Sequence, residues 1–184
     1  MVISEEQNQK FLKHLTKVNG YNSGDFFQLY DKYLTLYTGY NMLFNEIPEI
    51  LRNKGIKLHG SEREGEKATV LIAQFLNTEA TTKLINDNEE DIGRLIWVIE
   101  KNIFNIKLDY KGNPDKNKDA SILAGLKSKN EDEKFLAMVQ VIYFVRCNMS
   151  HGSKALEEYQ RLLLEPLVNI LSTLVDGLYK TMIA

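Results

Sequence analysis

The sequence predicts an all-α protein, a helical bundle of about five or six helices that forms one domain over residues 1–184. Only 3 prolines occur, whereas residues that favour helices, such as Leu, Glu and Lys, are abundant. Apolar residues recur at the helical period of about 3.6 in several stretches. No run of strands, internal repeat or linker interrupts this pattern.

Two helices are expected at the start of the chain. The first covers residues 4–18 and ends at the turn-forming residues 19–24. Asp25 opens the second, with Gln28 three residues later completing a capping box. Pro48 is expected to end or kink this helix near Glu46. Its inward stripe has helical spacing and consists of Tyr30, Tyr33, Leu34, Tyr37, Asn41 and Phe44.

The middle of the chain alternates loops and helices. A loop over 55–65 precedes a third helix at 66–76, and a fourth begins at the acidic residues 89–91, which favour its positive dipole end. The tract 107–129 is expected to be mostly loop, with a short helix at 120–126. It holds six lysines and three aspartates, which favours a solvated loop over a nucleic-acid patch when the tract is taken alone.

Two long helices are expected to end the chain. Asn130 with Glu133 forms a capping box, and the helix that follows reaches about Asn148. This helix is apolar nearly all round from 135 to 145, which predicts the most buried, central position. The last helix is expected to begin at Ser153 and to be kinked by Pro166.

Composition favours a cytoplasmic protein without membrane contact. The first residues lack the pattern of a signal peptide, and the longest apolar run is shorter than the ~20 residues of a membrane helix. A single cysteine, Cys147, excludes an intrachain disulfide and suits a reducing compartment. The formal net charge of −2 means that nucleic acid would be attracted only by a local patch.

Candidate chemistry is concentrated where the apolar run ends, at Arg146, Asn148 and His151. Arg146 has the same helical phase as the apolar residues before it, so its charge needs an anion, and a structural ion pair is the simpler explanation. His151 lies five residues on, about 140° around a continuous helix, so the two side chains would point apart. They meet if the helix unwinds near Gly152, or if two subunits complete one site across a two-fold axis.

This stretch resembles the signature of the HEPN superfamily (higher eukaryotes and prokaryotes nucleotide-binding). The Arg-x4-His pattern occurs in Val145-Arg146-Cys147-Asn148-Met149-Ser150-His151-Gly152-Ser153-Lys154, which is similar to a bacterial branch whose motif reads "Y-x-V-R-C-N-L-F-H-G-x-K". The second helix adds Tyr33 and Tyr40-Asn41-Met42-Leu43-Phe44, which resembles the aromatic helix of that branch. The likeness covers the aromatic helix and the last two helices.

The resemblance implies an all-α, usually dimeric protein, in many members a metal-independent ribonuclease of toxin, antiviral or RNA-processing systems. Arg146 would bind the scissile phosphate, and His151 would act as acid or base while the RNA 2′-hydroxyl attacks, leaving a 2′,3′-cyclic phosphate. The family's polar residue after the arginine is here Cys147, so Asn148 would take the supporting role. Lys154 and Tyr143 are candidate substrate contacts, although Tyr143 is expected mainly to pack.

The sequence therefore predicts a homodimeric endoribonuclease with catalytic Arg146 and His151, no cofactor and no metal, in a toxin–antitoxin or phage-defence setting with an antitoxin or operon partner. The alternative is a non-catalytic HEPN-like dimer that binds RNA, a nucleotide or a protein partner. A thiol nucleophile formed by Cys147 with His151 is weaker, because no third orienting group is identifiable. A zinc site lacks ligands at suitable spacing.

Overall fold

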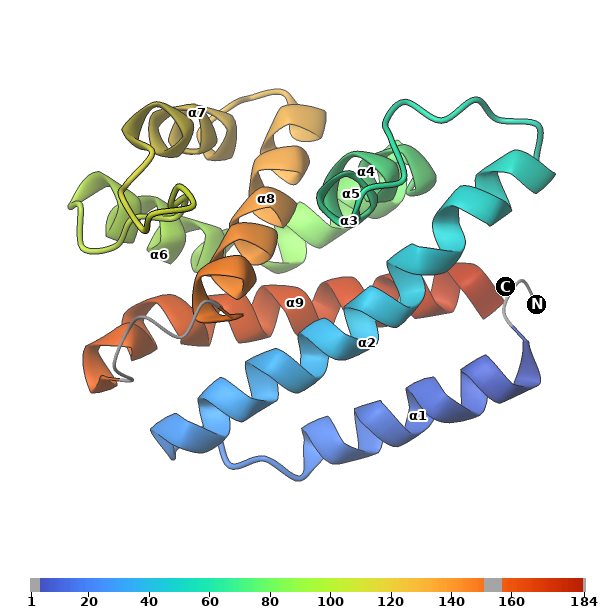
Figure 1. The fold of residues 1–184 in the computed structure, drawn as a ribbon, viewed down its shortest axis with the longest axis horizontal. Coiled ribbons are helices and arrows are strands. Elements are labelled where there is room, and N and C mark those ends of the chain that lie inside the picture. The colour runs from blue at the N-terminus through green and yellow to red at the C-terminus, as the bar shows by residue number, and fades with distance from the viewer. Residues whose placement is uncertain (1–3, 151–156, 184) are drawn as a thin grey trace.

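The computed structural model describes residues 4–150 and 157–183, and within these ranges the regular structure is helical, apart from one isolated bridge between Leu108 and Pro114 (Figure 1). The prediction of an all-α helical bundle is confirmed. The described residues contain more helical segments than the five or six expected, because the region from 64 to 87 is divided more finely than its sequence indicates.

The first two helices are α1 (Glu5–Asn19) and α2 (Phe26–Asn53). Of the two outcomes expected at Pro48, an end or a kink near Glu46, the end is wrong, because the helix continues past Pro48 for another turn and a half. A proline inside a helix removes one backbone hydrogen bond. Here the residues around it, Ile47, Ile50 and Leu51, are buried, and their packing holds the chain helical.

Asp25 caps α2 as expected, since its carboxylate accepts a 2.9 Å hydrogen bond from the Gln28 backbone N–H. The reciprocal half of the capping box is wrong. The Gln28 side chain accepts instead from the backbone N–H of Asn22, also at 2.9 Å. The glutamine thus stabilises the preceding turn rather than the cap itself.

Three short segments replace the single helix expected at 66–76: α3 (Glu64–Glu66), a π-helical turn (Lys67–Leu71) and α4 (Ile72–Phe75). The Tyr40 hydroxyl donates a 2.5 Å hydrogen bond to the carbonyl of Ala68 in the π turn, so α2 contacts the widened backbone directly. Such turns are rare and depend on local contacts of this kind.

A further helix, α5 (Thr78–Asp87), was not expected. Asn77 caps it, and its buried residues are Thr81, Leu84 and Ile85. A stretch with three threonines and few apolar residues has little helical patterning. Its contacts with α8 and α9 therefore decide the helical conformation.

The fourth expected helix is α6 (Glu89–Glu100), followed by α7 (Lys116–Leu126). The latter begins four residues earlier than expected. Asp115 is its N-cap, with a carboxylate that accepts a 3.0 Å hydrogen bond from the Lys118 backbone N–H. The tract 107–129 is therefore about half helical rather than mostly loop.

The two long C-terminal helices are α8 (Glu131–Ser150) and α9 (Arg161–Ile183), the latter preceded by a 3-10 turn over 158–160. Asn130 caps α8 as expected, but Glu133 does not complete a capping box, because its carboxylate accepts from the Ser128 hydroxyl instead. The predicted N-cap Ser153 lies outside the described residues.

Helices α2 and α9 form the most extensive pair, and they cross at the centre of the molecule (Figure 1). Helix α1 packs on α2, while α5 and α6 pack on α9. Helix α8 packs on α7, α5 and the π turn, with most of its apolar side chains buried. The central position that was expected for α8 is thus shared with α2 and α9. The buried side chains of all these helices form one hydrophobic cluster.

One helical stretch, Glu158–Ile183, is long and apolar enough to cross a membrane by length and composition. Of its most apolar window, 56% is buried inside the protein. A helix in the core of a soluble protein has the same properties, so the stretch does not distinguish the two. The expected absence of membrane contact stays a prediction.

Candidate functional site

Arg146 lies in the last described turn of α8, where its side chain reaches towards α2 and α3. Its guanidinium Nη1 is 3.6 Å from Oε1 of Glu64, and its Cζ lies 5.2 Å from the centroid of the Tyr37 ring. The Arg146 side chain keeps 31% of its surface exposed, and Glu64 keeps 42%. The Arg146 guanidinium therefore contacts the Glu64 carboxylate, the Tyr37 ring and solvent.

The pair with Glu64 is weak enough to be exchanged. A partly exposed ion pair contributes about 0–1 kcal/mol to stability, since water screens both charges. The cation–π contact with Tyr37 adds about 0.5–1 kcal/mol at exposed sites. The guanidinium is thus oriented by its surroundings, and a ligand with stronger negative charge can displace the carboxylate.

Two tyrosines of α2 face this end of α8. The Tyr33 hydroxyl donates a 2.7 Å hydrogen bond to the carbonyl of Ile142, which fixes α2 against the turn that precedes Arg146. The Tyr37 hydroxyl, in contrast, has no hydrogen-bond partner among the described residues, although its residue is only 3% exposed. Burial raises the pKa of both phenols, and the nearby Glu64 carboxylate raises that of Tyr37 further.

The Tyr143 side chain extends from α8, is half-buried and packs against Gly65 of α3. A Cβ atom on Gly65 would lie 3.1 Å from the end of the Tyr143 ring, so a larger residue would displace the ring by a few tenths of an ångström. Burial raises the pKa of Tyr143 to about 12, and a hydrogen bond with Cys147 and the charge of Glu64 raise it too. Tyr143 therefore packs in the fold, as expected, and contacts the surroundings of Arg146 through Cys147.

Asn148 anchors a neighbouring loop. Its Nδ2 donates a 2.9 Å hydrogen bond to the carbonyl of Ile106, in the chain that leaves α6. This bond gives the asparagine a role in the fold that its position after Arg146 and Cys147 does not indicate. A supporting role in chemistry stays a prediction.

His151 and Lys154 lie outside the described residues. The structure describes α8 as helical up to Ser150, so the two geometries that would bring Arg146 and His151 together stay predictions. Within the described residues, the sequence candidates that lie close together are Arg146, Tyr143 and, through its neighbour Cys147, Asn148.

Sequence reasoning missed Glu64 and the particular position of Tyr37. Glu64 was assigned to a loop, and nothing local marks it among its acidic neighbours. Tyr37 was recognised as part of the inward stripe of α2, but the stripe does not show which tyrosine faces the arginine. The seven-residue heptad-like interval between Tyr37 and Phe44 indicates burial only.

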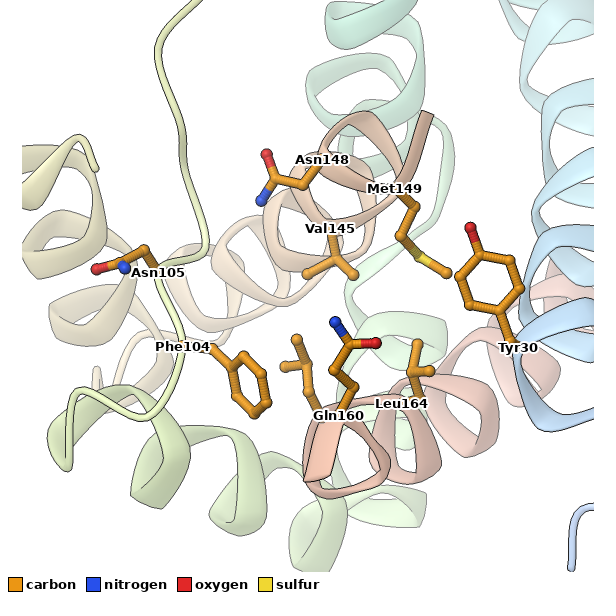
Figure 2. Close-up of a pocket in the computed structure, with 9 residues that line it drawn as sticks. Tyr30, Phe104, Asn105, Val145, Asn148, Met149, Gln160 and Leu164 are labelled. Carbon is orange, nitrogen blue, oxygen red and sulfur yellow. The ribbon is translucent and has the colours of Figure 1, made fainter. Parts of the chain in front are cut away.

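An apolar pocket lies beside the end of α8 (Figure 2). Its volume is about 70 Å³, and it is lined by Tyr30, Phe104, Asn105, Val145, Asn148, Met149, Gln160, Leu163 and Leu164. In Figure 2 the Met149 side chain extends towards Tyr30, and Val145 points into the pocket. Ligand pockets typically measure about 300–1,000 Å³, so this space is too small for a nucleotide.

Within residues 4–150 and 157–183, no three His, Cys, Asp or Glu side chains are grouped as a metal site requires. Comparisons with protein-family models, with curated proteins and with solved structures found no match for this chain. The HEPN likeness therefore depends on the residues of the motif and of the aromatic helix alone.

Proposed function

We propose that the protein is a metal-independent endoribonuclease of HEPN type, with Arg146 and His151 as catalytic residues at a homodimer interface. Its setting is a toxin–antitoxin or phage-defence system. The observation that carries the proposal is the geometry of Arg146: its partly exposed guanidinium lies in the last described turn of α8, over the Tyr37 ring and 3.6 Å from the Glu64 carboxylate.

Arg146 suits the binding of a phosphodiester. Guanidinium groups bind phosphate through two parallel hydrogen bonds, which are stronger than a single 3.6 Å contact with a carboxylate. A scissile phosphate that enters the site replaces Glu64 as the counter-ion. The buried Tyr37 hydroxyl, which has no partner within residues 4–150 and 157–183, is an additional donor beside the same guanidinium.

The proposed reaction is a transesterification within the RNA. The 2′-oxygen attacks phosphorus, the bond to the 5′-oxygen breaks, and the products are a 2′,3′-cyclic phosphate and a 5′-hydroxyl. The proton of the 2′-hydroxyl goes to a base, and the 5′-oxygen takes up a proton from an acid. His151 provides one of these transfers in each active site, and Arg146 stabilises the charge on the phosphate oxygens.

A second candidate function is a non-catalytic HEPN-like dimer that binds RNA, a nucleotide or a protein partner. Two observations favour it: Arg146 already has a counter-ion in Glu64, and the residue after the arginine is Cys147 in place of the polar residue of the motif. In this case Arg146 and the residues around it hold an anionic ligand, and no proton is transferred.

An RNase assay in the presence of a chelator separates the two candidates. The wild-type protein is expected to cleave single-stranded RNA and to leave 2′,3′-cyclic ends, whereas an RNA with 2′-deoxy residues stays intact. His151→Ala should lower the rate by about 10²–10⁴-fold, as the loss of a general acid or base does. His14→Ala, on the surface of α1, is the matched control and should leave the rate unchanged.

Circular dichroism and sedimentation complete the test. Both histidine variants should keep the helical spectrum and the dimeric mass of the wild type. A wild-type protein that binds RNA but cleaves none of many substrates would establish the second candidate instead. A fully active monomer would overturn the placement of the site between subunits.

A further inference from the structure

A second groove lies on the face of α8 that carries Cys147 and Asn148. Its volume is about 400 Å³, within the range of ligand sites, and it is lined by Lys107, Leu108, Asp109, Tyr110, Lys111, Gly112, Cys147 and Asn148. Cys147, which lines the groove, directly follows Arg146 in α8. The groove therefore lies beside the helix turn that carries the proposed catalytic arginine.

The loop that forms one wall is held in shape by its own hydrogen bonds. The Asp109 carboxylate accepts from the backbone N–H groups of Lys111 and Asn113, both at 2.8 Å, and the Asp109 N–H donates to the Asn113 carbonyl at 2.8 Å. Gly112 has a φ of +82°, which this tight turn requires. A wall organised in this way is preformed and loses little entropy when a ligand binds.

The aspartates of this tract are directed to the backbone. Besides Asp109, Asp115 caps α7, and the buried Asp119 accepts hydrogen bonds from the N–H groups of Ile106 and Lys107 at 3.2 and 2.8 Å. Their carboxylates thus stabilise the loop rather than its lysines. The aspartates keep their negative charges, but the six lysines outnumber them, so the tract from 107 to 129 stays net positive.

Three lysines carry positive charge beside the groove. Lys107 Nζ lies 4.7 Å from the Phe144 ring centroid, and Lys118 Nζ lies 5.8 Å from the same centroid. Phe144 shares a face of α8 with Cys147 and Asn148, which are three and four residues further on. None of the ion pairs among the described residues includes Lys107, Lys111 or Lys118.

Tyr110 provides an aromatic surface at the same place. It is 91% exposed, the most exposed large apolar side chain among the described residues, and Lys111 lies 5.4 Å from its ring centroid. An aromatic ring left in water is a platform on which an unpaired base can stack. Exposed rings interleaved with lysines are typical of grooves that bind single-stranded nucleic acids, whereas acidic peptides have no need of the ring.

We propose that this groove binds the single-stranded RNA substrate, with phosphates at Lys107, Lys111 and Lys118 and a base stacked on Tyr110. The strand then continues along α8 to Arg146. The inference deepens the proposed function and rests on it. It assigns substrate binding to residues that lie outside the Arg-x4-His motif.

The test measures binding without cleavage, by fluorescence anisotropy of a labelled single-stranded RNA with the Arg146→Ala protein. The double variant Lys107→Gln/Lys111→Gln should bind about tenfold more weakly, and its slope of log K against log salt should fall by about 1.4, because each phosphate contact contributes roughly 0.7 on a single strand. The matched control is Lys13→Gln/Lys17→Gln on α1, which removes the same charge and should change neither quantity.

The stacking contact has its own pair of variants. Tyr110→Ala should weaken binding roughly tenfold without altering the salt slope, since stacking involves no counter-ion. Tyr110→Trp should restore the affinity. Equal binding of the matched DNA oligonucleotide would support the groove, because phosphates and base faces are common to both strands.

Two results would overturn the inference. One is an equal loss of affinity in the α1 control and in the groove variant, which would indicate diffuse attraction only. The other is an RNA affinity that is unchanged in both the lysine and the tyrosine variants, together with polyglutamate displacing RNA equally well from the wild type and from Tyr110→Ala. If the wild type still cleaves RNA in either case, the groove fails and the proposed function stands.

Discussion

The Tyr37 hydroxyl makes a sharp test of the structure, because its removal should stabilise the protein. Tyr37→Phe deletes one oxygen and keeps the ring, so the edge-on contacts of the ring with Tyr40 and Phe44 remain, with centroids 5.8 and 6.4 Å away. The contact with Arg146 depends on the face of the ring and remains as well. The hydroxyl itself is the only group that changes.

Two other buried tyrosines of α2 are the matched controls. Tyr33 and Tyr40 are both 0% exposed, and their hydroxyls donate to the carbonyls of Ile142 and Ala68 at 2.7 and 2.5 Å. Substitution of Tyr33 or Tyr40 by Phe removes a hydrogen bond, whereas Tyr37→Phe removes a hydroxyl that makes none among the described residues. The three variants therefore share their chemistry and differ only in the partner of the oxygen.

The magnitudes follow from the cost of polar burial. A buried donor without a partner costs about 1–3 kcal/mol, so Tyr37→Phe should raise the free energy of unfolding by up to that amount. Loss of a typical satisfied hydrogen bond lowers it by about 0.5–1.5 kcal/mol, which is expected for Tyr33→Phe and Tyr40→Phe. For a chain of this size each kcal/mol moves Tm by roughly 2–4 °C.

Urea denaturation followed by circular dichroism measures all three variants under the same conditions. The free energy of unfolding should rise in Tyr37→Phe and fall in Tyr33→Phe and Tyr40→Phe, relative to the wild type. If Tyr37→Phe loses as much stability as Tyr33→Phe, the hydroxyl has a partner in solution and the reasoning is refuted. A stabilised Tyr37→Phe that also binds RNA more weakly would indicate that the site retains this donor for its ligand.

Two further predictions concern packing and pH. Gly125→Ala in α7 should lower the free energy of unfolding by about 1–3 kcal/mol, because the new Cβ would lie 2.7 Å from the Cβ of Ala137. Gly93 in α6 has open space around it, so Gly93→Ala should raise the free energy of unfolding by about 0.5–1 kcal/mol. Stability should also fall as pH rises above about 10, by at most ~1.4 kcal/mol per pH unit for each buried tyrosine. Burial raises the pKa of Tyr33, Tyr37 and Tyr40 in α2 and that of Tyr143, so the folded protein retains protons that the unfolded chain releases. Urea denaturation of the glycine variants, and of the wild type from about pH 8 to about pH 11, measures these effects, and a flat pH profile would contradict the second.

Local signals predicted the helices whose ends are chemically marked. Asp25 and Asn130 are short polar side chains in front of long apolar stripes, and both act as N-caps. Such signals act within one turn, so one sequence is enough to recognise them. The second halves of both capping boxes failed, because Gln28 and Glu133 found partners in the preceding turns instead.

Features that depend on tertiary contacts could not be predicted. Pro48 stays inside α2 because of the packing around it, and α5 is helical despite its threonines. The ion pair of Arg146 with Glu64 joins residues that are far apart in the sequence, and many other carboxylates were equally plausible partners. The orientation of each tyrosine in α2 likewise depends on what the other helices place beside it.

The pairing of α2 with α9 has a consequence for synthesis on the ribosome. About 100 residues separate the two helices, and chains are made at about 5–20 residues per second, so α2 emerges roughly 5–20 s before its main partner. During that interval the buried face of α2, with its tyrosines and leucines, has only α1 and the segments after it to cover it. Nascent chains of this protein are therefore expected to need a chaperone until α9 leaves the tunnel.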